Sequence, residues 1–207
     1  SFYIYNYEPD DSKKYFLNEV DILIERKFKG IKYIEADFFQ EKHISFLSED
    51  SKSTGKFFFE SPDKICFKTV NPFKLILIAT NNSVTKYEFI DGNWKQLLVP
   101  NQERICKIIS QITSLISGNF NDKKDIYDIS FKEEEKRIRL SLIPKNENLR
   151  KYIKFIELKI SKDNFSISQI LIQESHEDYT KITFSNEKLN IKMTILPPNT
   201  TPKIDKS

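Results

Sequence analysis

Short runs in which apolar and polar residues alternate, separated by turn residues, dominate the pattern of the chain. Pro, Asn, Asp and Gly residues separate these runs, as they do between the strands of hairpins. The pattern therefore predicts a mainly β protein built from antiparallel strands. The predicted strands cover residues 31–47, 56–60, 65–69, 73–79, 84–90, 94–99, 126–131, 137–143, 152–160, 165–173, 181–184 and 189–196.

Two of these runs carry further detail. In 137–143 the apolar residues Ile138, Leu140 and Leu142 alternate strictly with polar ones, so the strand has one dry face and one wet face. In 31–47 the apolar residues do not alternate strictly; they are Tyr33, Ile34, Phe38, Phe39, Ile44 and Phe46. This interruption predicts a bulge or a bend.

Two stretches follow the helical period instead. Residues 13–27 predict an amphipathic helix before the first strand. A second helix is predicted after Pro100, with Asn101 as its N-cap and Gly118 at its C-terminal end. Such a helix must pack its apolar stripe against an apolar surface. The stripe consists of Ile105, Ile108, Ile109, Ile112, Leu115 and Ile116.

The length of 207 residues fits a single domain over residues 1–207, in which 1–11 and 198–207 are expected to be mobile or edge segments. Seventeen Phe residues and 30% charged residues indicate a large apolar interior beneath a charged surface. A net charge of +3 gives no argument for nucleic acid as a partner. No stretch approaches the roughly 20 apolar residues of a membrane span, so an integral membrane protein is not expected.

The residues that carry chemistry are few and scattered. His43 and His176 have no second ligand at metal spacing, and we expect both on surface strands. The run Glu133 to Glu135 fits a solvated hairpin turn. Cys66 and Cys106 are the only cysteines, and the sequence leaves open whether they form a disulfide. No catalytic motif is present, so we expect no enzyme, no metal and no cofactor.

The order of the turn residues adds a family resemblance. A strand led by Gly55 runs into Ser61-Pro62, a second strand ends at Asn71-Pro72, and the next hairpin carries Tyr87. This order resembles the outer-membrane lipoprotein carrier protein (LolA) family. Residues 34–40 resemble the first long strand of that family, and 193–198 resemble its closing strand and proline pair. The chain departs from the family at Ser61, which stands where members carry an Arg that faces the lid, and at Asn81 and Thr200, which replace glycines.

The resemblance implies a strongly curved, incompletely closed antiparallel β-barrel, with a few helices that form a lid over a concave hydrophobic face. It implies that the lid carries the isoleucines of the second helix, Ile105, Ile108, Ile109, Ile112 and Ile116, and that Ser61 is a lid contact. The lipid-binding cavity residues implied are Phe38, Phe57, Phe59, Ile65, Phe67, Leu75, Leu77, Ile138, Leu140 and Leu142.

The implied function is that of a periplasmic carrier that shields the acyl chains of lipoproteins between the inner and the outer membrane. Its partners would be acylated lipoproteins, an inner-membrane lipoprotein-releasing transporter and an outer-membrane acceptor, and we expect a monomer. Because the sequence opens at Ser1 without a methionine, we expect a form from which the signal peptide was removed. Two alternatives remain open: an acceptor or envelope-stress sensor of the same fold, and a β-rich interaction domain that binds no lipid.

Overall fold

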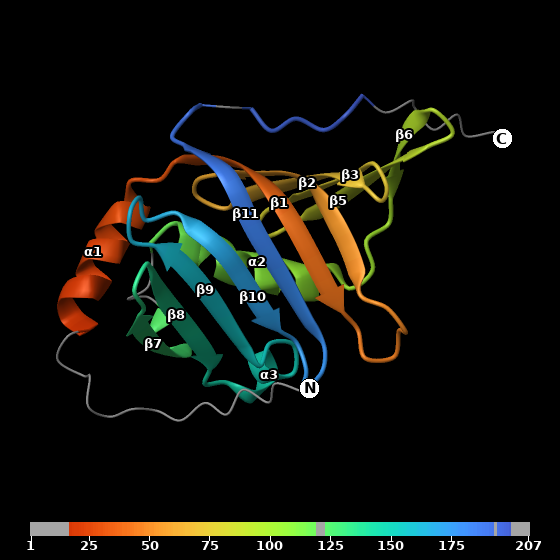
Figure 1. Cartoon of the computed structure of the whole chain (residues 1–207). Coiled ribbons are helices and arrows are strands. Elements are labelled where there is room, and N and C mark those ends of the chain that lie inside the picture. The colour runs from red at the N-terminus through yellow and green to blue at the C-terminus, as the bar shows by residue number, and fades with distance from the viewer. Residues whose placement is uncertain (1–16, 119–122, 193, 200–207) are drawn as a thin grey trace.

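Eleven antiparallel strands form one sheet in the computed structural model, which describes residues 17–118, 123–192 and 194–199 (Figure 1). The first six strands are β1 (Tyr33–His43), β2 (Ser51–Glu60), β3 (Lys64–Asn71), β4 (Leu75–Ala79), β5 (Val84–Ile90) and β6 (Asn93–Leu97). The remaining five are β7 (Tyr127–Glu133), β8 (Arg137–Pro144), β9 (Phe155–Ser161), β10 (Ile167–Gln173) and β11 (Tyr179–Leu189).

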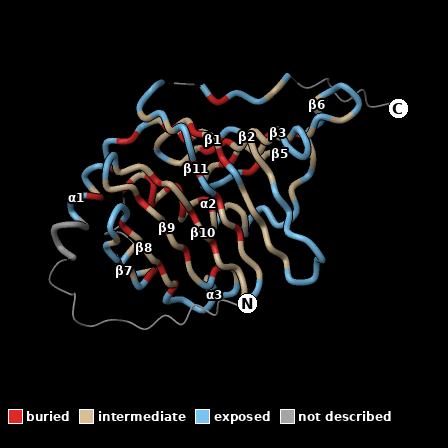
Figure 2. Tube along the Cα trace, viewed as in Figure 1, coloured by how far each residue is buried: buried red, intermediate tan, exposed pale blue. Residues whose placement is uncertain are grey.

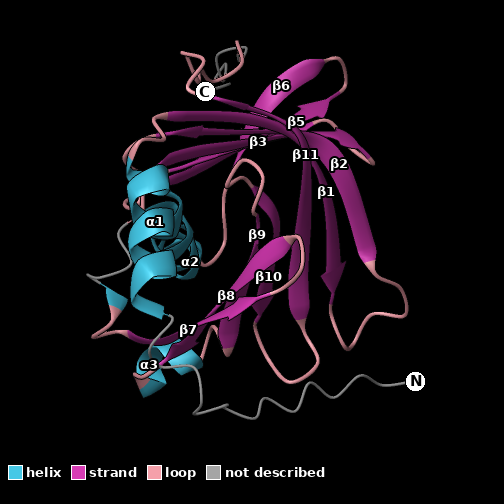
Figure 3. Cartoon of the chain, turned by 60° about the vertical axis from the view of Figure 1, so that its left-hand side comes forward, coloured by secondary structure: helices cyan, strands magenta, loops and turns pink. Residues whose placement is uncertain are grey.

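The sheet is strongly curved and does not close. Its strand order is β6-β5-β4-β3-β2-β1-β11-β10-β9-β8-β7, so β6 and β7 are the two edges and do not pair with each other. Figure 3 shows the strands curling around a concave side on which the helices lie. The predicted fold class, a curved and incompletely closed antiparallel barrel with few helices, is confirmed.

The centre of the sheet contains the bulge that the sequence predicts in the first long strand. The register of β1 with β11 shifts between Glu35 and Asp37. Opposite this shift Asn186 takes φ 54°, and its side-chain amide donates to Asp37 Oδ2 at 2.7 Å. That hydrogen bond, together with Lys56, lowers the pKa of Asp37. Because a bulge increases local twist, it helps the sheet to bend around its concave face.

A glycine allows β2 and β3 to approach closely at a second irregularity. The β2–β3 register shifts between Thr54 and Gly55. A Cβ atom at Gly55 would lie 2.0 Å from the carbonyl oxygen of Lys68, so no other residue fits without moving the backbone. The close approach of β3 therefore explains why a glycine, Gly55, stands at this position of β2.

Within the described residues three α-helices accompany the sheet: α1 (Leu17–Lys29), α2 (Gln102–Ile116) and the single turn α3 (Glu147–Arg150). α2 crosses the concave side, and α1 lies beyond its C-terminal end, against Gly118 (Figures 1 and 3). The first predicted helix, 13–27, is described from Leu17 onward and ends two residues later than predicted, while 13–16 lie outside the described residues. None of the helices in the described ranges is both long and apolar enough to span a bilayer.

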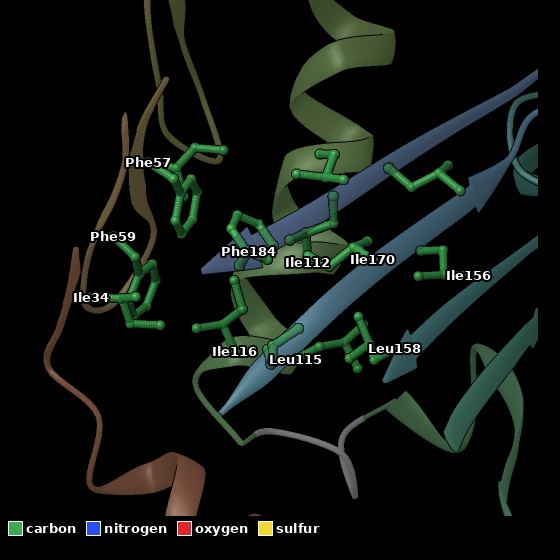
Figure 4. Packing of buried hydrophobic residues seen from close by; sticks show 14 of the residues in the cluster. Ile34, Phe57, Phe59, Ile112, Leu115, Ile116, Ile156, Leu158, Ile170 and Phe184 are labelled. Carbon is green, nitrogen blue, oxygen red and sulfur yellow. The ribbon is translucent and has the colours of Figure 1, made fainter. Parts of the chain in front are cut away.

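The main core lies between the concave face and the two long helices (Figure 2). The C-terminal half of α2 contributes Leu115 and Ile116, and α1 contributes Ile24 and Phe28, which is fully buried. Figure 4 shows side chains of α2 facing those of β2, β10 and β11. At roughly 1.5–3 kcal/mol per fully buried large apolar side chain, these contacts hold α2 on the sheet.

The predicted strand 189–196 is wrong. The observed β11 already extends to Leu189, and the chain leaves the sheet at Asn190, which takes φ 58°. Residues 190–192 and 194–199 form no strand. Instead, Ile195 packs on the outer face of the sheet with an exposed fraction of 3%, and its carbonyl accepts a hydrogen bond from Lys64 Nζ at 2.9 Å. This outer cluster consists of Cys66, Ile76, Tyr87 and Ile195, flanked by Phe58, Ile78 and Trp94.

Three further expectations have clear outcomes. The two cysteines are free: Cys66 is buried in the outer cluster, and Cys106 lies half-buried on α2. His43 lies on β1, where its Nδ1 is 2.6 Å from Asp50 Oδ1, but His176 lies on a bend between β10 and β11, so its expected strand position is wrong. The run from Glu133 forms the β7–β8 turn, as expected.

Candidate functional site

A cavity of about 480 Å³ lies between α2 and the concave face of the sheet. Its apolar lining comes mainly from α2 and from six strands, and polar side chains line the remainder. The lining residues are Phe38, Gln40, Lys42, Ser53, Phe57, Ile65, Phe67, Thr69, Leu75, Leu77, Lys86, Pro100, Asn101, Ile105, Ile108, Ile109, Ile112, Ile170, Ile172, Glu174, Thr180, Ile182 and Phe184.

Four phenylalanines from four strands form a connected part of the sheet side of the cavity. The ring of Phe67 lies 5.2 Å from that of Phe38 and 5.0 Å from that of Phe57, and Phe57 lies 5.0 Å from Phe184. All three pairs are tilted or edge-on, which are favoured geometries for aromatic rings. The result is a rigid apolar surface that makes contacts without preferred direction.

The N-terminal half of α2 covers this surface, and we call α2 the lid helix. Ile109 and Ile112 are buried, whereas Ile105 and Ile108 are only half-buried. All four line the cavity because they follow the spacing i, i+3, i+4 and i+7 on one helix face. The part of the lid helix nearest its N-terminus is thus the least covered by other residues.

Polar side chains gather at one end of the cavity, where β1 and β10 end and β11 begins. Glu174 accepts a hydrogen bond from the hydroxyl of Thr180 at 3.0 Å and lies 3.7 Å from Lys42 Nζ. Gln40 lies on the same face of β1 as Lys42. The cavity is therefore amphipathic, with an apolar body and a polar rim.

The lid helix is fixed mainly at its C-terminal end. The hydroxyl of Thr113 shares its proton between the Ile109 carbonyl at 3.0 Å and Asn81 Oδ1 at 3.3 Å, and that of Ser117 donates to the carbonyl of Pro62 at 3.1 Å. Gly118, at φ 75°, lets α1 approach, since a Cβ there would lie 2.7 Å from the carbonyl oxygen of Glu25. Asn81 is one of the two glycine replacements noted in the sequence, and here it binds the lid helix.

The predicted N-cap position of the lid helix is confirmed, but the side chain there does not cap the helix. Asn101 does occupy the N-cap position, but it takes the left-handed conformation with φ 53°, and its side chain makes no cap hydrogen bond. Its backbone carbonyl accepts from the Ile105 amide at 3.2 Å. The first turn of the lid helix thus lacks the side-chain cap that usually stabilises a helix start.

The predicted site residues fall into two groups. Ten of them line the cavity: Phe38, Phe57, Ile65, Phe67, Leu75, Leu77, Ile105, Ile108, Ile109 and Ile112. The others lie in the main core, outside the cavity lining: Phe59, Ile116, Ile138, Leu140 and Leu142. Ser61 lies next to the lid end, since its neighbour Pro62 accepts the hydrogen bond from Ser117, but its own amide donates to Lys32 at 2.8 Å.

Sequence reasoning missed the contribution of β10 and β11 to the cavity. Ile170 and Ile172 on β10, and Ile182 and Phe184 on β11, line it together with the polar rim. Only Ile182 and Phe184 alternate with polar neighbours, whereas Ile170 and Ile172 flank Leu171 in a continuous apolar run that does not mark one face. What the sequence lacked was the β1–β11 pairing, which places this face beside Phe38.

Comparison with known proteins bears on this arrangement. A family model described as "Outer membrane lipoprotein carrier protein LolA" matches residues 29–195, which is most of the chain and includes every strand and the lid helix. The chain belongs to the LolA family. The resemblance seen in the sequence is thereby confirmed, and the LolA family supports a role in lipoprotein sorting.

Individual relatives are distant. An outer-membrane lipoprotein carrier protein from Francisella philomiragia is 28% identical over 200 residues, covering 93% of this chain and 91% of its own. A LolA superfamily protein from Nitrosomonas europaea is 9% identical, with 84% and 94% of the two chains covered and a TM-score of 0.40. The Mycobacterium tuberculosis lipoprotein LppX is also 9% identical, with 84% and 96% covered and a TM-score of 0.46. Membership in the LolA family rests on the family match.

Proposed function

We propose that the protein carries the acyl chains of lipoproteins in the cavity beneath the lid helix and moves them through the periplasm from the inner to the outer membrane. The observation that supports this most directly is the amphipathic cavity, roofed by isoleucines and lined by four phenylalanines, in a chain of the LolA family. A volume of about 480 Å³ lies within the range of roughly 300–1,000 Å³ of small-molecule sites.

The physics of the cargo fits such a cavity. Each CH₂ group removed from water contributes roughly 0.8 kcal/mol, so a multiply acylated protein cannot cross water with its chains exposed. An apolar lining without directional bonds can cover these chains and still let them slide out during transfer. A polar rim formed by Glu174, Thr180 and Lys42 would lie beside the polar part of the cargo.

Further parts of this proposal follow from the LolA family. The partners would be acylated lipoproteins, an inner-membrane lipoprotein-releasing transporter and an outer-membrane acceptor, and the carrier would act as a monomer without catalysing a reaction. The lid residues would be the cavity-lining isoleucines of α2, and Ser61 would limit their movement by supporting Pro62 beneath Ser117. The second candidate, an acceptor or sensor of the same fold, would use the same cavity.

Binding of a fluorescent fatty-acyl probe tests the proposal, with the substitution Ile108→Asp in the lid helix. Ile108 lines the cavity and is half-buried, so a carboxylate there should lower probe affinity about tenfold or more while costing about 1 kcal/mol of unfolding free energy. Fluorescence titration and urea unfolding measure the two quantities.

Two control variants separate cargo binding from stability. Ile116→Val removes a methylene group from the buried core outside the cavity, so it should cost about 1 kcal/mol and leave probe affinity unchanged. Ser114→Asp adds the same charge to α2 at a residue that does not line the cavity. Equal loss of probe binding in all three variants, or no binding by the unmodified protein, would favour a β-rich interaction domain that binds no lipid.

A further inference from the structure

The segment from Lys64 to Tyr87, which spans β3, β4 and most of β5, has an unusual charge pattern. It contains four lysines and no Asp or Glu. Lys64 and Lys86 lie 3.7 Å and 3.6 Å from carboxylates of flanking residues. Lys68 and Lys74 have no carboxylate partner among the described residues and instead lie over the rings of Phe58 and Phe89. This part of the surface therefore carries uncompensated positive charge.

Exposed apolar side chains lie beside these two lysines. Phe73, in the turn between β3 and β4, has an exposed fraction of 67%, and Val70 in the same hairpin has 54%. Phe89 on the neighbouring β5 is also exposed. We call the surface formed by Lys68, Val70, Phe73, Lys74 and Phe89 the hairpin patch.

The base of the hairpin patch is held in place. The Phe89 amide donates to the carbonyl of Lys74 at 3.0 Å, and Lys74 Nζ lies 5.0 Å from the Phe89 ring centroid. Phe89 in turn packs edge-on against Trp94 at 5.4 Å. The patch is therefore presented as a defined surface, with Phe73 projecting from it.

The hairpin patch adjoins the cavity. Thr69 and Leu75, which flank the turn on either side, both line the cavity, while the residues between them do not. Figure 1 places the ends of β3 and β5 near this turn at the end of the sheet where the lid helix begins. A surface that binds the hairpin patch would thus lie next to the least anchored part of the lid helix.

We propose that the hairpin patch docks on an anionic lipid bilayer surface. Aromatic and aliphatic side chains flanked by lysines are the combination that inserts shallowly between headgroups while the lysines contact anionic lipids. An acidic protein surface would complement the lysines but would leave Phe73 and Val70 without the apolar environment that a bilayer supplies. Docking would hold the cavity at the membrane. The docking itself is independent of the proposed carrier function, but this purpose rests on it.

Vesicle co-sedimentation of the full chain tests the proposal. We expect binding to vesicles of phosphatidylethanolamine and phosphatidylglycerol, weakening as salt is added, and much weaker binding to phosphatidylcholine alone. Lys74→Gln should lower the apparent affinity about fivefold, since each lysine near an anionic surface contributes about that factor. Phe73→Ser should lower it by a similar or larger factor, and thermal melts should confirm that both variants fold.

Phe46 provides the matched control. It has an exposed fraction of 84% and lies in the β1–β2 connection, close in sequence to the acidic Glu49 and Asp50. Phe46→Ser should leave vesicle binding unchanged. Equal loss in Phe46→Ser and Phe73→Ser, equal binding to phosphatidylcholine, or no binding to anionic vesicles would overturn the proposal. Capture of an acidic protein without vesicle binding would also overturn it, in favour of a protein partner.

The acyl-probe titration without vesicles separates this proposal from the carrier function. Phe73→Ser should bind the probe normally, because Phe73 does not line the cavity. If the unmodified protein binds vesicles but not the probe, the carrier function fails and the docking surface stands. If it binds the probe but not vesicles, only the docking surface fails.

Discussion

Glu187 shows how a single buried carboxyl couples the stability of this fold to pH. It follows the Asn186 bulge on β11, and burial raises its pKa from the usual 4.5 to about 7, while a hydrogen bond with Ser166 opposes that shift. Its Oε2 atom has no hydrogen-bond partner within the described residues. The charged form is therefore the unfavourable one in the folded protein.

The expected consequence is a loss of stability as pH rises. Between about pH 4.5 and 7 the folded protein binds more protons at this group than the unfolded chain does, so the free energy of unfolding falls as the proton is lost. Glu187→Gln should remove this dependence and stabilise the protein at neutral pH by about 2 kcal/mol, a value reduced for partial solvent screening. Urea unfolding at about pH 5 and about pH 8 measures the difference.

The carboxyls of Asp37 and Asp178 do not contribute to this change between about pH 4.5 and 7. Hydrogen bonds from Asn186 and from the Ser45 amide lower the pKa values of Asp37 and Asp178 below their usual 3.8. Their contributions to stability are present above that value and disappear only at lower pH. A variant Glu187→Gln whose stability falls with pH as steeply as that of the unmodified protein would contradict the assignment.

At the scale of elements, the C-terminal segment acts as a cover for the outer face of the sheet. Ile195 closes the outer cluster over Cys66, and burial raises the pKa of the Cys66 thiol to about 11. A buried thiol with a raised pKa reacts slowly, because only the thiolate attacks thiol reagents. The reactivity of Cys66 therefore reports whether this segment is in place.

We expect Ile195→Ser to accelerate labelling of Cys66 by a thiol reagent at least tenfold in a Cys106→Ser background. Leu196→Ser, on the same segment but exposed, should leave the rate unchanged. Mass spectrometry of the labelled peptide over time gives both rates. Equal rates in the two variants would mean that the segment does not control access to Cys66.

The same segment marks the limit of what the sequence predicts. Strand 84–90 was predicted with its observed bounds, and the helix after Pro100 and the β1 bulge were also found, because each has a local pattern. Residues 189–196 alternate just as well, yet only Leu189 belongs to a strand, and 190–192 and 194–196 form none. Alternation shows that a segment has one apolar face. It does not show whether the segment pairs with a neighbouring strand or packs on the outer face of the sheet.

The site shows a similar limit. Leu140 and Leu142 were correctly placed on a dry face, and they are fully buried. They do not line the cavity but lie in the main core, which also contains Ile24 and Phe28 of α1 and Leu115 and Ile116 of α2. Which apolar residues face a cavity and which face a helix depends on tertiary packing, and no local pattern encodes it.

At the scale of the whole molecule, the uneven attachment of α2 predicts how the lid moves. Thr113 and Ser117 bind the β4–β5 and β2–β3 turns, whereas the start of the helix lacks a side-chain cap. Opening should therefore begin at the N-terminal half and pivot near Thr113.

Hydrogen exchange measures this difference directly. Amides from Cys106 to Ile109 should exchange faster than those from Thr113 to Ile116, and bound acyl probe should slow the first group more than the second. Thr113→Val should speed exchange in the C-terminal half by removing the hydrogen bond to Asn81. Uniform exchange along α2 would indicate that the helix moves as a rigid body or not at all.

The unpaired edges β6 and β7 have a mechanical consequence. Backbone hydrogen bonds fix the spacing of neighbouring strands at about 4.8 Å everywhere else in the sheet, but no such bond spans the gap between these two. The concave side of the sheet can thus widen by small changes in twist spread over many strands. No backbone hydrogen bond between strands has to break. A cargo larger than the cavity would therefore strain the sheet elastically. Release of that strain would favour release of the cargo.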